Sequence, residues 1–220
     1  MKRFLPIFAA AFVLVGGAAY MLMPTRGGDG LPQLGAANAQ TAEAAVEIVD
    51  MTLGNPDANV TIIEYASYTC PHCKNFHTNQ FKTLKSEYID TGKVNFIYRE
   101  VYFDRPGLWA SMVARCGGQE RFFGITDLIY ERHPGWLGSG DGMTIIGDLR
   151  KIGKVAGLSD EELDVCMSDA DTAGALYQWF QTNAEADNIT STPSFVINGT
   201  KYTNMSHDEF RAILDPLIEG

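Results

Sequence analysis

The sequence predicts an α/β fold into which a long all-helical segment is inserted. Strand-like and helix-like segments alternate on both sides of residues 107–187, which themselves show helical periodicity almost throughout. A strand–helix–strand crossover takes about 30 residues, far fewer than this helical segment. We therefore expect residues 46–106 and 188–219 to form one α/β domain, and residues 107–187 to form a helical domain inserted into it.

The N-terminal part of the α/β domain is expected to contain three strands and one helix. A short strand over residues 46–51 precedes a turn at 54–57. The β-branched residues of segment 60–66 predict a buried strand. Apolar residues at helical spacing predict an amphipathic helix over residues 74–90, and a further strand is expected over 93–101.

Apolar faces within residues 107–187 predict about five helices. The C-terminal elements are expected to be a strand over 194–197, a hairpin turn at Asn198-Gly199, a return strand over 201–203 and a helix over 208–218 capped by Ser206 or His207. We expect the histidines His133 and His207 to lie at the surface.

The N-terminus has the features of a targeting segment. A basic start is followed by residues 4–23, which carry no charge. Their length permits a membrane anchor, whereas Ala37-Asn38-Ala39 resembles a cleavage site, so residues 1–23 are either a signal peptide or a signal anchor. Residues 24–45 predict a flexible linker. In both cases the rest of the chain is exported, either soluble or tethered to the membrane by residues 4–23.

Charge and cysteine content narrow the class of function. The net charge of −10 is the opposite of a basic nucleic-acid footprint, so we expect no nucleic-acid partner. The even number of cysteines in an exported chain indicates two disulfides. The local pair Cys70–Cys73 leaves Cys116–Cys166 as a structural disulfide, whose loop closure contributes about 4 kcal/mol in the chain-entropy model.

Four residues, Cys70-Pro71-His72-Cys73, stand where a strand leads into a helix. A sulfur at a helix N-terminus faces unpaired N–H groups and the positive end of the helix dipole, which stabilise a thiolate. Cys70 is therefore the candidate nucleophile and Cys73 the resolving thiol. Pro71 suits the first helical turn. His72 can donate a hydrogen bond or add positive charge beside the Cys70 thiolate.

The same segment allows two other interpretations. One is an inert structural disulfide. The other is a metal site made of Cys70, His72, Cys73 and His77, whose nitrogen and sulfur atoms suit zinc. The sequence contains no second CxxC and no histidine pair, so we expect neither a metal nor a cofactor.

Together with Glu64 and Thr192-Pro193, this segment resembles the DsbA family of periplasmic thiol:disulfide oxidoreductases, over residues 45–219. The family has a thioredoxin fold with a helical insertion. Glu64, six residues before Cys70, falls at the family's buried-acid position, and Thr192-Pro193 falls at its cis-proline position. The stretch from Glu64 to Cys70 is similar to the α-proteobacterial branch.

The resemblance implies roles for these residues. A carboxylate buried in an apolar strand is costly unless it is paired or protonated, and Glu64 would relay protons to Cys73. The alternative is a glutamate at a strand edge, facing solvent. Thr192 and Pro193 would bind an extended substrate peptide. Threonine replaces the valine of the best-known DsbA oxidants and is common in isomerases, which leaves the direction of the reaction open.

The leading prediction is an enzyme that introduces disulfides into newly translocated proteins through the Cys70–Cys73 pair. The expected partners are unfolded or reduced exported proteins and a DsbB-type quinone-linked membrane oxidase, and the protein is expected to be a periplasmic monomer. The alternatives are a disulfide isomerase or reductase, and a chaperone-like module that binds peptides without using the cysteines.

Overall fold

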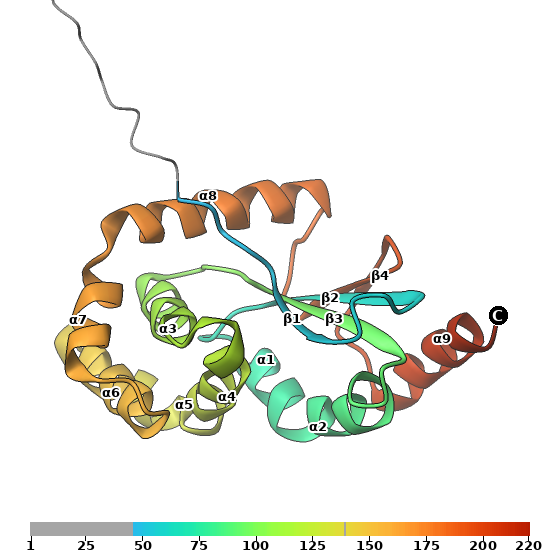
Figure 1. The fold of residues 1–220 in the computed structure, drawn as a ribbon, viewed down its shortest axis with the longest axis horizontal. Helices are drawn as coiled ribbons and strands as arrows, with labels where there is room; N and C mark the ends of the chain where they lie inside the picture. Colours follow the sequence, from blue (N-terminus) through green and yellow to red (C-terminus); the bar gives the residue numbers. More distant parts are fainter. Residues whose placement is uncertain (1–45, 139) are drawn as a thin grey trace, which may run out of the picture. The chain divides into compact units, whose positions relative to one another are not determined.

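The computed structural model describes residues 46–138 and 140–220. In this part of the chain a five-stranded sheet is covered by helices on both faces (Figure 1). The signal segment and the linker predicted for residues 1–45 lie outside the described residues. Within the described ranges, no helix is both long and apolar enough to cross a lipid bilayer.

The strand order in the sheet is β1-β3-β2-β4-β5. The two central strands, β2 (Val60–Ala66) and β3 (Val94–Glu100), run parallel to each other. The edge strands β1 (Met51–Gly54) and β5 (Thr200–Thr203) and the inner strand β4 (Ser194–Ile197) pair antiparallel with their neighbours. The α/β architecture with inserted helices is confirmed.

The first strand lies later in the chain than predicted. It begins at Met51, and residues 46–50 have no regular structure. Side-chain hydrogen bonds hold this stretch in place of sheet hydrogen bonds. The Arg99 guanidinium donates to both carboxylate oxygens of Asp50, at 2.9 and 3.0 Å. The Arg115 guanidinium donates to the carbonyl of Val49. The prediction of a strand over 46–51 is therefore wrong, apart from Met51.

One long helical segment follows β2. It consists of α1 (Pro71–Asn75), the π-helical η1 (Phe76–Phe81), α2 (Lys82–Leu84) and the π-helical η2 (Lys85–Ile89). The four apolar residues that the helical spacing indicated, Phe76, Phe81, Leu84 and Tyr88, are all buried, and Ile89 is buried as well. They pack one face of the sheet, where α9 (His207–Glu219) also lies (Figure 1).

Between β3 and β4 the described residues form six helices, one more than predicted. They are α3 (Arg105–Cys116), α4 (Gly118–Glu131), α5 (His133–Leu137), α6 (Gly142–Val155), α7 (Asp160–Ser168) and α8 (Ala170–Ala186). Five residues are too few for α5 to show a helical period in the sequence. In Figure 1, α3 to α7 gather at one end of the sheet, whereas α8 runs along the face opposite α1. The division into two domains stays a prediction.

Buried charges attach these helices to the sheet. Arg115 of α3 donates two hydrogen bonds of 2.7 Å to the buried carboxylate of Glu100 in β3. The guanidinium groups of Arg99 and Arg115 lie 5.6 and 5.5 Å from the ring of Trp179 in α8. Paired charges and cation–π contacts therefore hold α3 and α8 against β3.

The predicted C-terminal hairpin is confirmed. Asn198 and Gly199 have φ values of 46° and 82°, the left-handed pair that a type I′ turn requires. The side chain of Asn198 also accepts a 2.8 Å hydrogen bond from the N–H of Thr61, which ties the turn to β2. Ser206 caps α9 and shares a capping box with Glu209.

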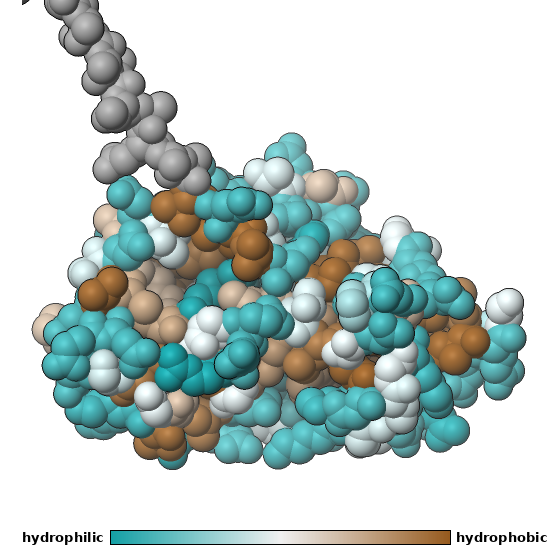
Figure 2. Space-filling model, in the orientation of Figure 1, coloured by the Kyte–Doolittle hydropathy of each residue, from teal (hydrophilic) through white to brown (hydrophobic). Residues whose placement is uncertain are grey.

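Surface hydrophobicity alone does not single out a functional site. On the face that Figure 2 shows, hydrophobic residues form separate patches among hydrophilic ones. The exposed large hydrophobic residues come from several elements and include Phe103, Met143, Val165 and Tyr177. Reactive side chains, and not surface hydrophobicity, mark the functional site.

Candidate active site

Cys70 caps the N-terminus of the helical segment that follows β2. Its backbone is extended, with φ −82° and ψ 121°, and Pro71 is the first helical residue. The N–H groups of His72 and Cys73 are directed at its sulfur. Cys70 is half-buried, whereas Cys73, three residues further on, is fully buried. One thiol is thus accessible and the other is enclosed, and both are free in this structure.

The surroundings of Cys70 favour its thiolate. The pKa of Cys70 falls from 9.0 to about 5, chiefly through a hydrogen bond from the Cys73 thiol, against the opposing effect of partial burial. The neighbouring side chain of Thr192 and two main-chain N–H groups lower the pKa further. At neutral pH, Cys70 is therefore ionised and ready to react as a nucleophile or to leave as a stable thiolate.

The surroundings of Cys73 have the opposite effect. Burial raises the pKa of Cys73 far above its ordinary value, and the negative charges of Cys70 and Glu64 raise it further. Burial is the largest cause of the difference between the two sulfurs. Cys73 is a neutral thiol at physiological pH.

Thr192 and Pro193 form the wall opposite Cys70. The peptide bond between them is cis, and Pro193 is buried. The Cys70 thiol lies 3.5 Å from the Thr192 carbonyl, to which it donates when protonated. The register of β4 against β2, with Ser194 opposite Tyr65, brings this loop to the cysteines.

Glu64 is fully buried, so the alternative of a solvent-facing glutamate is wrong. Alternation along β2 places its side chain on the same face as Ile62 and Ala66, toward the helical segment. There its Oε2 lies 3.1 Å from Nε2 of His77, in η1. Its other oxygen, Oε1, is buried without a hydrogen-bond partner.

The sequence indicates His77 only as a candidate metal ligand. In the structure it is buried and hydrogen-bonded to Glu64, whereas His72 is exposed to solvent. Among the described residues, no three His, Cys, Asp or Glu side chains are grouped as metal ligands. The signal for His77 was its place one helical turn after Cys73, which puts both on one face of the helix.

Helix α4 supports the loop before Cys70. The hydroxyl of Tyr130 donates to the carbonyl of Ser67 at 3.2 Å. The hydroxyls of Tyr68 and Thr126 are 2.8 Å apart. The inserted helices therefore contribute directly to the position of the CxxC segment.

The prediction of a surface position is wrong for His133. This residue begins α5, is only 8% exposed, and lies beside Thr69 and Cys70. Burial lowers the pKa of His133, which keeps the imidazole neutral near the reactive thiol. No local pattern marks it, because it stands between two helices and precedes a proline.

A disulfide joins Cys116 at the end of α3 to Cys166 in α7, with 5.8 Å between their Cα atoms. It closes a loop of 50 residues within the inserted helices. Neither cysteine belongs to the group of residues around Cys70.

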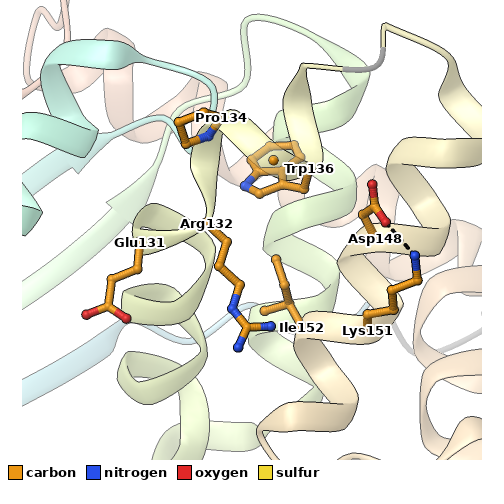
Figure 3. Close-up of a pocket in the computed structure, with 8 residues that line it drawn as sticks. Glu131, Arg132, Pro134, Trp136, Asp148, Lys151 and Ile152 are labelled. Atoms are coloured by element: carbon orange, nitrogen blue, oxygen red, sulfur yellow. Dashed lines mark hydrogen bonds and ion pairs between the residues drawn. The ribbon is translucent and has the colours of Figure 1, made fainter.

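A cavity of about 410 Å³ lies among α4, α5 and α6 (Figure 3). Trp136 and Ile152 line it together with the charged side chains of Arg132 and Lys151. None of the site residues predicted from the sequence lines this cavity.

Comparison with known proteins identifies the family. A family profile described as thioredoxin matches residues 47–216. A relative from Rickettsia bellii, provisionally named a protein-disulfide oxidoreductase, is 35% identical over 171 residues, which are 77% of this chain and 65% of the relative. Disulfide bond formation protein D from Bacillus subtilis is 26% identical over 180 residues, 76% of this chain and 77% of the relative.

The fold agrees with these matches. The crystal structure of α-DsbA1 from Wolbachia pipientis superposes with a TM-score of 0.73 at 28% identity, covering 80% of this chain and 94% of that one. The chain spans somewhat less than two thirds of the length of the Rickettsia relatives. The Rickettsia and Bacillus relatives and the Wolbachia structure to which the chain is similar are protein-disulfide oxidoreductases and DsbA-type proteins by name. The profile match shows that the chain belongs to the thioredoxin family.

Proposed function

We propose that this protein is an exported thiol–disulfide oxidoreductase that introduces disulfides into newly translocated proteins through Cys70 and Cys73. The observation that carries the proposal is the opposite behaviour of the two sulfurs. Cys70 has a pKa of about 5, whereas burial keeps Cys73 protonated. A stabilised thiolate in the reduced enzyme makes its disulfide a stronger oxidant.

The size of this effect follows from the pKa of Cys70. At pH 7, a pKa near 5 instead of 9 stabilises the reduced form of the enzyme by the equivalent of about two pH units. For a two-electron couple, this makes the reduction potential about 60 mV more oxidising. Because Cys70 is half exposed, solvent screening makes this an upper value.

The reaction begins when a substrate thiolate attacks the Cys70 sulfur of the enzyme disulfide. The bond between Cys70 and Cys73 breaks, and Cys73 leaves and takes up a proton, which we assign to relay by Glu64. The second substrate thiolate then attacks the substrate sulfur of the mixed disulfide, and Cys70 leaves as the stabilised thiolate. The substrate loses two electrons, and the enzyme gains them.

Thr192 and Pro193 are proposed to hold the substrate peptide beside Cys70. In this structure the side chain of Thr192 lowers the pKa of Cys70, which favours the oxidising direction. We further propose a periplasmic location, a monomeric state and reoxidation by a DsbB-type quinone-linked membrane enzyme, because the fold is similar to that of a DsbA protein.

Oxidative refolding of a reduced protein tests the proposal. The wild-type protein should speed disulfide formation, and Cys70→Ala should abolish the effect. Full activity of Cys70→Ala would refute it, and peptide binding that survives loss of both cysteines without any oxidation would favour a chaperone-like module. The reduction potential of the Cys70–Cys73 pair against glutathione separates an oxidase from a reductase.

A further inference from the structure

The buried pair of Glu64 and His77 is incompletely satisfied. Glu64 is fully buried and His77 is 2% exposed, and their single hydrogen bond is 3.1 Å long. The remaining polar atoms, Oε1 of Glu64 and Nδ1 of His77, are both buried without a partner. Buried polar groups are normally paired, and a redox or catalytic role is one reason why a buried group stays unpaired.

Aromatic rings enclose the pair. The imidazole of His77 stacks on the ring of Tyr130 at 4.4 Å, and Phe81 lies 4.7 Å away on the same helical segment. The hydroxyl groups of Tyr98 and Tyr130 hydrogen-bond to each other, at 2.7 Å, rather than to the pair. The other titratable groups that face the pair are Cys73 on α1, Tyr98 on β3, and Tyr130 and Asp127 on α4.

Cys73 requires a proton donor in this enclosure. When a substrate thiolate attacks Cys70, the electron pair of the broken S–S bond passes to the Cys73 sulfur. Burial raises the pKa of Cys73 strongly, so an unprotonated Cys73 is a poor leaving group. The negative charge of Glu64 also raises the pKa of Cys73. Glu64 is hydrogen-bonded to His77, which follows Cys73 by four residues on the same face of the helical segment.

A buried carboxyl group on its own would keep its proton, because burial disfavours the charged form. An N–H group that donates to the carboxylate offsets this penalty and lets the proton leave. His77 Nε2 is the atom in position to do so, at 3.1 Å from Glu64 Oε2.

We propose that His77 is a positioning residue that holds Glu64 so that Glu64 can give its proton to Cys73 as Cys73 leaves the enzyme disulfide. In this step the Cys70–Cys73 bond breaks, a bond between the substrate sulfur and Cys70 forms, and the proton passes from Glu64 to Cys73. The carboxylate that results accepts the His77 N–H. In the reverse reaction Glu64 takes the proton from Cys73. This inference rests on the proposed thiol–disulfide exchange.

The test is the rate at which dithiothreitol reduces the Cys70–Cys73 disulfide of the full-length protein, measured in single-turnover experiments from pH 5 to pH 9. Glu64→Gln removes the proton and should slow the step about 100-fold, the lower end of general acid catalysis. His77→Phe should slow it to a similar extent and change the pH profile. His77→Gln retains an amide donor, so its disulfide should be reduced at least about tenfold faster than that of His77→Phe.

A second pair in the same chain provides the matched control. Nε2 of His207 lies 3.1 Å from Oε2 of Glu87, but this pair is partly exposed and joins α9 to η2. His207→Phe should leave both the rate and its pH profile unchanged. Circular dichroism of each variant establishes that it is folded, and Glu64→Gln/His77→Phe should be no more than about twofold slower than either single variant.

Three results would overturn the inference: His77→Gln as slow as His77→Phe, single-variant effects that multiply in the double variant, or an unchanged pH profile in His77→Phe. Failure of the proposed function gives a different result. In that case the wild-type protein fails to oxidise a reduced protein. Its disulfide still reacts with dithiothreitol, and the variants at Glu64 and His77 still differ from the wild type in that rate.

Discussion

Replacing Cys73 by alanine should raise the pKa of Cys70. The hydrogen bond from the Cys73 thiol is the largest of the contributions that lower this pKa to about 5. Cys73→Ala removes the donor and leaves the helix N-terminus in place. Cys73→Ser is the matched control, because its hydroxyl group keeps a donor at nearly the same position.

The expected magnitude follows from the strength of a hydrogen bond to a charged group, about 1.5–3 kcal/mol. Cys70 is half exposed, so solvent screening favours the lower end, which corresponds to about one pH unit. The pKa should therefore rise to about 6 in Cys73→Ala and stay near 5 in Cys73→Ser. At pH 5.5 the thiolate fraction should fall from about three quarters to about one quarter.

The ultraviolet absorbance of the thiolate, followed against pH in the reduced protein, measures this pKa, and the alkylation rate with iodoacetamide gives a second reading. In the wild type only Cys70 titrates in the accessible range, because Cys73 is held protonated and Cys116 and Cys166 are joined in a disulfide. A midpoint for Cys73→Ala within about 0.3 units of the wild type would refute the reasoning. So would an equal shift in Cys73→Ser.

Three further outcomes can be measured. Thr192→Val should also raise the pKa of Cys70, by less than Cys73→Ala, because the hydroxyl of Thr192 makes a smaller contribution to lowering it. Thr192→Ser keeps the hydroxyl and should leave the pKa unchanged, and equal titration curves for the two variants would contradict this. Cys116→Ala/Cys166→Ala should lower the free energy of unfolding by up to about 4 kcal/mol in urea denaturation, and an unchanged midpoint would contradict it. Stability of the reduced protein relative to Cys70→Ala should rise with pH from about 5 toward 9, because the unfolded Cys70 keeps a proton that the folded one has lost. At pH 7 the free energy of unfolding should be higher by about 1–2 kcal/mol after allowance for solvent screening. A difference that falls as the pH rises would contradict the prediction.

The parts of the fold that the sequence predicted well have strong local signals. The CxxC segment stands between a β-branched run and an apolar helical pattern, so its place at a helix N-terminus follows from two adjacent elements. Asn198-Gly199 determines its own turn, because both residues adopt positive φ readily. The helices over residues 107–187 followed from periodicity alone.

What the sequence did not reveal depends on contacts between distant elements. His77 is 13 residues from Glu64, and only the packing of η1 on β2 brings them together. His133 is buried because a five-residue helix packs beside the CxxC segment, and such a short helix has no readable period. Strand β1 was misplaced because its pairing with β3, rather than its composition, sets where it starts.

The inserted helices belong to the chemistry of the site as well as to the fold. Cys70 and Cys73 lie only three residues apart, and the opposite directions of their pKa values reflect what surrounds each sulfur. Cys73 is enclosed by β2, η1 and Tyr130 of α4, whereas Cys70 faces the Thr192 loop and solvent. Because the enclosure of Cys73 raises its pKa and the hydrogen bond from its thiol lowers that of Cys70, packing from α4 acts on both sulfurs. The redox behaviour of the pair therefore depends on the inserted helices as well as on the strand and helix that carry the cysteines.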